Sequence, residues 1–480
     1  MKKKLILILA VFFCAVGFSF AQEDFDFQSD DDFFGDDSIV QIEETQTGNF
    51  SDEVNHGALF EDGSVKVGGK FSTSMEILAP VYKDDDLEFA KRLENTTLTP
   101  KVEGSLFVDA RPTQILRMYT KIDLAYPFQS TASSSSSATT YQTGSNFLTL
   151  VSTSTSISDY LSLKELFTDF SFADRVFFRF GKHTVSWGTG YFFSPVSDII
   201  NTSMIAPDDT DSQVDGSLNL RTQITFTNRQ DCLWLYVIPS TDFLSTSSTA
   251  SYLKDTALAA KYEAVLGGWE LGAGGFYRFE DSPKAMLTAS GSIIKGKVGV
   301  FAEAVYQYGT QYEWLQDKTF SDKTNLFFLT AGFNYYWKTP QITFAAQYYY
   351  DSFNEENFDL AKEYSQGAYS DIIHNYFTKG HNVAAAVNFA RIFGTTDFSA
   401  TLFAMMNFGK EEFSSTYKEM LSSGASSESY LNALTFSGIL NYTPFKNFTV
   451  GFGPYLTFDT WQSKPNVSAK LTLSLGGGKF

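Results

Sequence analysis

The sequence predicts an all-β fold: a transmembrane, antiparallel, up-and-down β-barrel of about 18 strands (16–18), with short periplasmic turns and long outer loops. Three observations lead to this prediction. Apolar and polar residues alternate from residue 64 onward, the connections between alternating segments are short and long in turn, and aromatic residues make up 16% of the chain. After the first two dozen residues no apolar run approaches the roughly 20 residues of a membrane-spanning helix, so a helical membrane protein is excluded.

The first residues predict an export signal. Lys2, Lys3 and Lys4 precede an apolar run from Leu5 to Phe20, which ends in small residues around Ala21. We therefore expect residues 1–21 to be a cleaved signal peptide. Its removal takes away three bases and leaves 33 bases against 55 acids, a formal net charge of −22, with Cys232 as the one cysteine. An intramolecular disulfide is thereby excluded in the mature chain, and the acidic balance disfavours nucleic acid as a partner.

Residues 22–63 predict an acidic, phenylalanine-rich periplasmic tail. Residues 22–44 contain ten acidic residues and no basic one, interleaved with Phe25, Phe27, Phe33 and Phe34. Like charges at this density resist packing and favour a solvated leader. The alternative is a tail whose phenylalanines dock on a partner or plug a pore.

The barrel is expected over residues 64–480, because alternation of period two recurs there as about 18 candidate strands. In the first of them, Val65, Val67 and Phe71 face one way while Lys66 and Lys70 face the other. The candidate strands lie near residues 64–77, 97–110, 115–126, 160–172, 174–187, 218–228, 231–239, 256–266, 269–279, 284–294, 296–308, 325–337, 341–350, 381–391, 396–408, 430–442, 447–459 and 465–476.

The connections favour a barrel over a β-sandwich. Short links such as Gly267-Gly268 alternate with long ones such as 127–159, 188–217, 351–380 and 409–429. A sandwich has no reason to place its long loops at one end, whereas a transmembrane barrel has short periplasmic turns and long outer loops. Closure is also required in a membrane, since an open edge would leave unpaired backbone groups at a cost of several kcal/mol each.

Aromatic residues and the C-terminus fit the same fold. Tyr335, Tyr336 and Trp337 end a candidate strand where an interfacial aromatic girdle is expected. Phe480 closes the chain after alternating leucines and is expected to be the insertion signal read by the barrel-assembly machinery. It is out of phase with those leucines, so the Gly476-Gly477-Gly478 stretch would have to bulge.

The most distinctive motif runs from Arg179 through Gly181, Lys182 and His183 to Trp187 and Gly188. It resembles a strand-plus-loop motif of Gram-negative porin-like barrels, including relatives of the alginate-export type, with His183 in the place of the usual glutamine. The resemblance covers about 25 residues and implies a channel in which residues 188–217 fold inward and narrow the lumen. The alternative is that Trp187 and Gly188 only end a strand at the lipid interface.

The polar parity of the strands predicts which charges line the lumen. Eight basic residues face eight acidic ones, which argues against strong ion selectivity. The best candidates for a constriction are Arg117, Arg179 and Arg221 opposite Asp123, Glu165 and Asp169, with Lys121 and His183 nearby. The sixteen are Lys66, Lys70, Lys101, Arg117, Lys121, Arg179, Arg221 and Lys261, and Glu76, Glu103, Asp109, Asp123, Glu165, Asp169, Glu263 and Glu303.

Metal and catalytic patterns are weak. Asp208, Asp209, Asp211 and Asp215 crowd an outer loop, but Val214 stands where an EF-type calcium loop requires glycine, so a solvated acidic loop is the better interpretation. No cofactor is predicted. No catalytic motif accompanies the four histidines, so an enzyme is not expected. A hydrolase site assembled from distant loops at the rim of the barrel is kept as an alternative.

These patterns together predict a channel in the bacterial outer membrane for passive diffusion of small hydrophilic solutes. The expected partners are outer-membrane lipid, the barrel-assembly machinery and the solutes. The sequence leaves open whether the chain forms a homo-oligomer. Two alternatives remain. One is a surface scaffold or adhesin whose outer loops bind other molecules. The other is a lipophile transporter similar to the fatty-acid barrels, plugged by the tail.

Overall fold

The computed structural model describes most of the barrel and its short turns. The described residues are 58–62, 64–82, 95–127, 138–143, 146–151, 161–173, 175–185, 187–200, 217–226, 230–239, 256–279, 281–309, 323–352, 380–407, 432–445, 448–459 and 466–479. The predicted signal peptide, most of the predicted tail, the cluster Asp208, Asp209, Asp211 and Asp215, and Phe480 lie outside these residues, as do most residues of the long predicted loops. Those predictions stay predictions.

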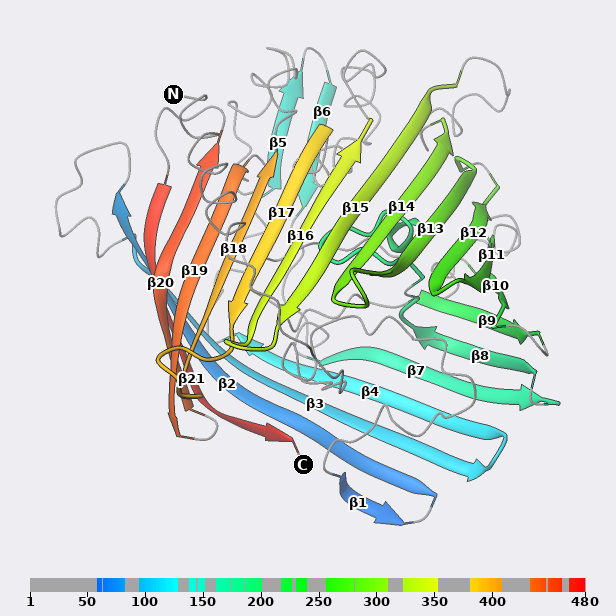
Figure 1. The fold of residues 1–480 in the computed structure, drawn as a ribbon, viewed down its shortest axis with the longest axis horizontal. Helices are drawn as coiled ribbons and strands as arrows, with labels where there is room; N and C mark the ends of the chain where they lie inside the picture. Colours follow the sequence, from blue (N-terminus) through cyan, green and yellow to red (C-terminus); the bar gives the residue numbers. More distant parts are fainter. Residues whose placement is uncertain are drawn as a thin grey trace. The chain divides into compact units, whose positions relative to one another are not determined.

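The strands close into a ring. Within the described residues one antiparallel sheet contains 19 strands, and its last strand in the chain, β21, pairs with β2 from Lys70↔Lys479 to Tyr82↔Val467. Strand β1 (Ala58–Asp62) pairs with β2 at Val65–Gly68, on the stretch of that edge beyond the end of β21. The other 18 strands form the ring, which Figure 1 shows as one continuous curved sheet. The predicted closed antiparallel barrel of about 18 strands is confirmed.

The ring strands, in chain order, are β2 (Val65–Tyr82), β3 (Thr97–Thr113), β4 (Leu116–Pro127), β7 (Leu161–Phe172), β8 (Val176–His183), β9 (Ser217–Thr225), β10 (Cys232–Ile238), β11 (Ala257–Leu266), β12 (Trp269–Tyr277), β13 (Lys284–Ile293), β14 (Val298–Tyr308), β15 (Asn325–Trp337), β16 (Ile342–Asp351), β17 (Gly380–Phe389), β18 (Phe398–Asn407), β19 (Asn432–Phe445), β20 (Phe448–Asp459) and β21 (Asn466–Lys479). A separate hairpin joins β5 (Ala138–Thr143) and β6 (Asn146–Val151). No helix among the described residues has the length and apolar character needed to cross a membrane.

The two faces of the sheet differ in chemistry. On β11, Leu258 and Tyr262 are exposed, at 54% and 42%, while Ala259 and Lys261 between them are buried, at 6% and 2%. The same parity recurs around the ring, with large apolar side chains exposed on one face. Along each strand, the buried alternate residues point to the inside of the closed ring, and the exposed apolar residues form its outer face.

The turns match the residues that form them. Leu266 pairs with Trp269, leaving Gly267 and Gly268 as a two-residue hairpin loop with φ of 62° and 82°. Positive φ at both central positions is the geometry that suits the twist of two antiparallel strands, and glycine adopts it without strain.

A bulge near the C-terminus resolves the phase of the last strand. Ser74 pairs with Ser474, but Ser72 pairs with Gly477, so β21 has one extra residue opposite Thr73. Gly476 lies in this bulge with a φ of 129°. The predicted bulge is therefore present, and it brings Gly478 onto the face of the preceding leucines.

Several strands differ from the sequence prediction. Strand β2 ends at Tyr82, five residues beyond the predicted 77, and the β5–β6 hairpin lies within 127–159, which was predicted as a long loop. Strand β8 ends at His183, four residues earlier than the predicted 187, because the chain leaves the sheet there and turns inward. Strand β1 lies inside the segment predicted as tail and extends the sheet at β2.

Candidate functional site: a segment across the barrel interior

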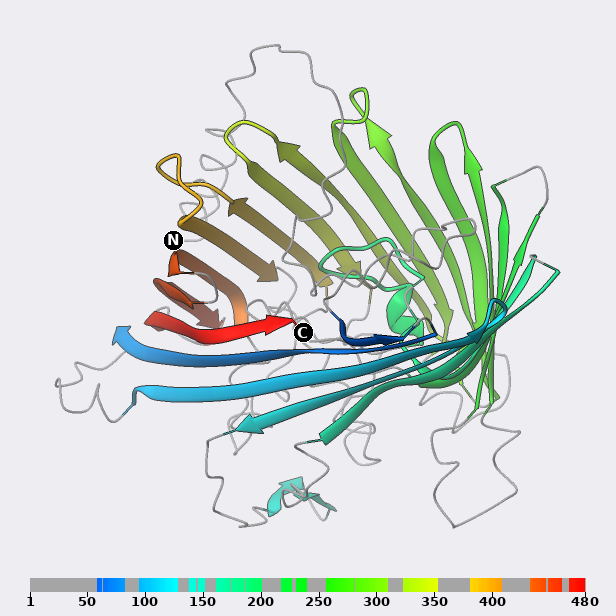
Figure 2. The same ribbon diagram turned by 90° about the horizontal axis from the view of Figure 1, so that it is seen from below.

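A segment that follows β8 crosses the inside of the barrel. Residues 187–200, here called the inward segment, contain the short 3-10 helix η2 (Ser197–Ile199) and lie on the concave side of the sheet (Figure 2). The inward segment contacts β11, β14 and β16, which are three, six and eight strands from β8 in the ring of 18, and β18, which is eight strands from β8 in the other direction. Strand β17 is nine strands from β8 and so lies opposite it in the ring, and β16 and β18 flank β17. Contacts with these two strands, on residues of the inner parity, place the segment across the interior. This agrees with the hypothesis that residues 188–217 fold inward as far as residue 200, and residues 201–216 lie outside the described residues.

Glu303 on β14 holds the first half of the inward segment. Its carboxylate accepts hydrogen bonds from the backbone N–H groups of Thr189 and Gly190, the latter at 2.5 Å, and from that of Val196 at 3.0 Å. The Ser194 hydroxyl donates to the two oxygens at 3.1 and 3.2 Å. Glu303 is 3% exposed. A concave row of N–H groups around a carboxylate is an anion nest, and charge-assisted bonds of this kind are roughly twice as strong as neutral ones.

Gln347 on β16 holds the next turn of the chain. Its Oε1 accepts from the backbone N–H groups of Tyr191, Phe192 and Phe193 at 3.0, 2.6 and 3.3 Å. Its Nε2 donates to the Phe193 carbonyl at 2.5 Å and to Thr330 Oγ1 at 2.6 Å. Gln347 is 2% exposed, so its amide supplies buried backbone groups of the inward segment with both an acceptor and a donor.

The glycines of the motif make this approach possible. A Cβ at Gly188 would collide with the Ser194 hydroxyl and the Glu303 carboxylate, and a Cβ at Gly190 would collide with the Phe193 carbonyl. Gly181, with a φ of 137°, leaves no room for a Cβ against the Leu166 carbonyl. Both glycines of the motif, and Gly190 after it, are therefore explained by close approach of the backbone to other groups.

Trp187 lies in the interior and not at the lipid interface. Its side chain is 5% exposed, Nε1 donates to the Val196 carbonyl at 2.7 Å, and its ring stands edge-on to Tyr236 at 5.1 Å. Lys261 Nζ donates to the Trp187 carbonyl and also forms a 2.5 Å ion pair with Glu263. The interpretation of Trp187 as an interfacial strand end is therefore wrong.

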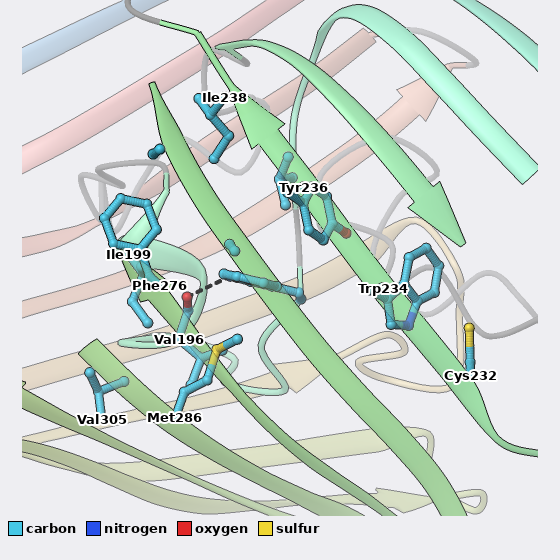
Figure 3. Packing of buried hydrophobic residues seen from close by; sticks show 13 residues of the cluster. Val196, Ile199, Cys232, Trp234, Tyr236, Ile238, Phe276, Met286 and Val305 are labelled. Carbon is cyan, nitrogen blue, oxygen red and sulfur yellow. Dashed lines mark hydrogen bonds between the residues drawn. The ribbon is translucent and has the colours of Figure 1, made fainter. Parts of the chain in front are cut away.

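Apolar packing fixes the inward segment to the wall. Val196, Ile199 and Trp187 pack into a cluster with the inner faces of β10 to β14 (Figure 3). The dashed line in Figure 3 marks the bond to the Val196 carbonyl. A second cluster joins Phe193 to Tyr349, with stacked rings 5.1 Å apart, and extends to β17 and β18.

The predicted arginines form a row near the short turns. Strand pairing sets Arg117 opposite Asp169, Asp169 opposite Arg179, and Arg179 opposite Arg221. The Arg179 guanidinium donates two hydrogen bonds to the Asp169 carboxylate, at 2.7 and 3.1 Å, and Arg117 lies 3.6 Å from the same carboxylate. Asp109 on β3 completes the row by accepting from Arg117 Nε at 3.0 Å.

Two arginines of this row are ion-paired and packed on an aromatic ring. Asp109 is 1% exposed, and the guanidinium groups of Arg179 and Arg117 lie 4.1 and 5.7 Å from the centre of the Phe167 ring. Buried arginines that pair with aspartates and stack on an aromatic face are held rigidly. Of the three predicted acids, Asp169 pairs with Arg117 and Arg179, and the second acid that pairs with Arg117 is Asp109.

The other predicted residues occupy different places. Glu165 pairs across strands with Lys121, and Asp123 follows two residues later on β4, further from the short turns than the arginine row. His183 is fully buried, with Nδ1 3.2 Å from the Gly181 carbonyl and its ring 5.9 Å from that of Phe167. Lys182 has the opposite parity and donates to the Leu163 carbonyl at 2.7 Å.

Sequence reasoning missed Gln347. It is a single amide in the apolar stretch from Phe344 to Tyr350, at the parity of the buried Ala345 and Tyr349, and that isolated polar residue was the available signal. Burial raises the pKa of the Tyr191 phenol in the inward segment. No group of three or more potential metal ligands occurs among the described residues.

Comparisons with known proteins concern the fold. Neither a protein-family model nor a curated protein sequence matches the chain. Similar solved structures include Pseudomonas aeruginosa OccK9 (OpdG), with 10% identity, 88% of this chain and 100% of that chain covered and a TM-score of 0.49. Acinetobacter baumannii OccAB4 has 9% identity, 86% and 98% coverage and a TM-score of 0.46. Pseudomonas aeruginosa OccK2 (OpdF) in complex with glucuronate has 8% identity, 86% and 96% coverage and a TM-score of 0.46. Because these TM-scores are below 0.5, we assign the barrel fold from the strand pairings of this chain alone.

Proposed function

We propose that the protein is a porin-like channel of the bacterial outer membrane, which lets small hydrophilic solutes diffuse passively through a lumen of mixed charge. The observation that carries the proposal is a closed ring of strands with apolar residues outside and an inward segment fixed across the inside. Closed barrels of this strand number enclose space for water unless a segment fills it. The inward segment narrows that space and leaves polar inner residues partly exposed.

The proposed location follows from the outer face. Exposed leucines, phenylalanines and tyrosines around a closed ring suit lipid, since each of the 18 ring strands pairs with a neighbour on both sides. We include in the proposal export by a signal over residues 1–21, an acidic tail over residues 22–57, which precede β1, and assembly by the barrel-assembly machinery. The narrower resemblance to alginate-export barrels is proposed on the motif from Arg179 to Gly188. Neither catalysis nor a cofactor is part of the proposed function.

The test is electrical. The mature protein, purified in detergent, is inserted into a planar bilayer and its single-channel current is recorded under a salt gradient. Stepwise conductance with weak ion selectivity is expected from a lumen in which acidic and basic groups pair. Silence from a protein that is folded and inserted would overturn the channel proposal and favour the scaffold. The same recordings on a chain lacking residues 22–57 test the tail as a plug, since a plug predicts higher conductance after its removal.

A further inference from the structure

The inner face of the barrel has a covered half. On β10, β13, β14 and β17, Tyr236, Met286, Val305 and Ala384 are 3%, 2%, 2% and 0% exposed. These side chains belong to the two apolar clusters that the inward segment completes. Apolar side chains of the barrel wall and of the inward segment are in direct contact here. They leave no route for water or a polar solute, since protein interiors of this kind are close-packed.

The opposite half has different chemistry. On β2, Ser74 pairs with Ser474 and Glu76 with Thr472 of β21, so the four side chains share one face. Phe71, on the other face of β2, is 49% exposed and marks the outside. Ser74, Glu76, Thr472 and Ser474 are all partly exposed on the inner side.

Strand β3 continues this surface. Glu103 pairs with Ser72, and Ser105 pairs with Lys70, both at the inner parity of β2. Leu106, at the alternate parity, is 41% exposed outside. Glu103 and Ser105 are partly exposed. We call Ser74, Glu76, Glu103, Ser105, Thr472 and Ser474 the polar wall.

The polar wall also carries compensating charge. Lys470 on β21 is 3% exposed and forms a 3.0 Å ion pair with Glu76, whose side chain is 41% exposed. A buried ammonium beside a partly exposed carboxylate leaves part of the carboxylate accessible to a passing solute and compensates its charge. Hydroxyl groups on both sides of this pair add neutral donors and acceptors.

We infer that solutes cross the barrel off-centre, along the polar wall, and that its hydroxyl and carboxylate groups are the residues that determine which solutes pass. The inward segment is then a fixed partition, not a central gate. The inference rests on the proposed channel function. It selects small solutes of balanced charge that offer hydroxyl groups or paired charges, because the wall offers the same groups in return.

Cysteine accessibility tests the path. In the full chain with Cys14→Ala and Cys232→Ala, single cysteines replace Ser74 or Ser105 of the polar wall, or the matched small residues Ala259 or Ala384 of the covered half. Folded protein is treated with a water-soluble methanethiosulfonate that carries a sulfonate, adducts are counted by mass spectrometry, and single-channel current is followed during the reaction. Adducts at Ser74→Cys and Ser105→Cys are expected, with a partial loss of conductance. Cysteines at the two alanines are expected to react only after unfolding.

The two readouts separate the inference from the proposed function. Reaction at the alanine positions, or none at the serine positions, overturns the off-centre path whatever the current does. Adducts at the serines with an unchanged current overturn it as well, because ions would then take another route. Adducts at the serines in a folded barrel that never conducts would sink the proposed channel and, with it, the path. If Ala384→Cys does not fold, Ala259→Cys serves alone.

Discussion

Replacement of Glu303 by glutamine should release part of the inward segment. Glutamine preserves the shape, so Oε1 can still accept from Thr189 and Gly190, but its amide nitrogen then faces the Val196 N–H group. One buried donor loses its acceptor, at about 1–3 kcal/mol, and the bonds that remain lose their charge assistance. A total of about 3 kcal/mol of anchoring is lost, which corresponds to roughly a 150-fold change in the detached population.

Hydrogen–deuterium exchange measures this directly. Amide groups of Thr189, Gly190 and Val196 should exchange faster in Glu303→Gln, by up to roughly two orders of magnitude. The amides bound by Gln347 should change less and serve as an internal control. Glu103→Gln, which removes the same charge from the polar wall, controls for charge alone and should leave these amides protected. Equal protection of the three amides in Glu303→Gln and in the wild type would refute the reasoning.

Three further predictions concern the motif and the arginine row. Arg179→Ala leaves a buried aspartate without its bidentate partner and should lower the free energy of unfolding by about 3–5 kcal/mol, measured by urea titration in detergent, whereas Arg111→Ala, at a half-exposed guanidinium, should cost about 1 kcal/mol or less. Gly188→Ala should raise amide exchange across the inward segment, because its Cβ collides with the carboxylate that anchors the segment; unchanged exchange would contradict this. Joint replacement of Arg117, Arg179 and Arg221 by alanine should shift the reversal potential toward cations, and an unaltered potential would remove this row from the conduction path.

The strand framework was predictable from sequence because its cause is local. Side-chain parity, short turns and strand length are all set within about a dozen residues, so each of the 18 ring strands was located to within a few residues. The bulge at Gly476 was predictable for the same reason, since a phase break between Leu475 and the chain end is visible in the sequence.

The site was predictable only in part because its contacts are long-range. The motif pointed to the segment after His183, but its anchors are more than 100 residues away: Glu303 lies 107 to 114 positions and Gln347 lies 154 to 156 positions from their partners. Parity placed Glu303 inside without showing what it binds. The arginine row was found, yet the pairing of Arg117 with Asp109 depends on a diagonal contact between β3 and β4 that strand parity leaves undefined.

The quality of the alternation itself reports on what covers the inner face. Strand β2 alternates between apolar and polar residues up to Glu76, and its inner face contributes Ser74 and Glu76 to the polar wall. Strand β10 reads Cys232–Ile238 without a polar residue, because its outer face shows Leu235 and Val237 while its inner face is buried under the inward segment. A strand that is apolar on both faces needs an apolar partner on both. Lipid can supply the outer partner under the proposed function, and the inner one must come from the chain. Breaks in alternation along β10 and β16 therefore indicate where the inward segment packs, just as the motif from Arg179 to Gly188 indicates where that segment begins.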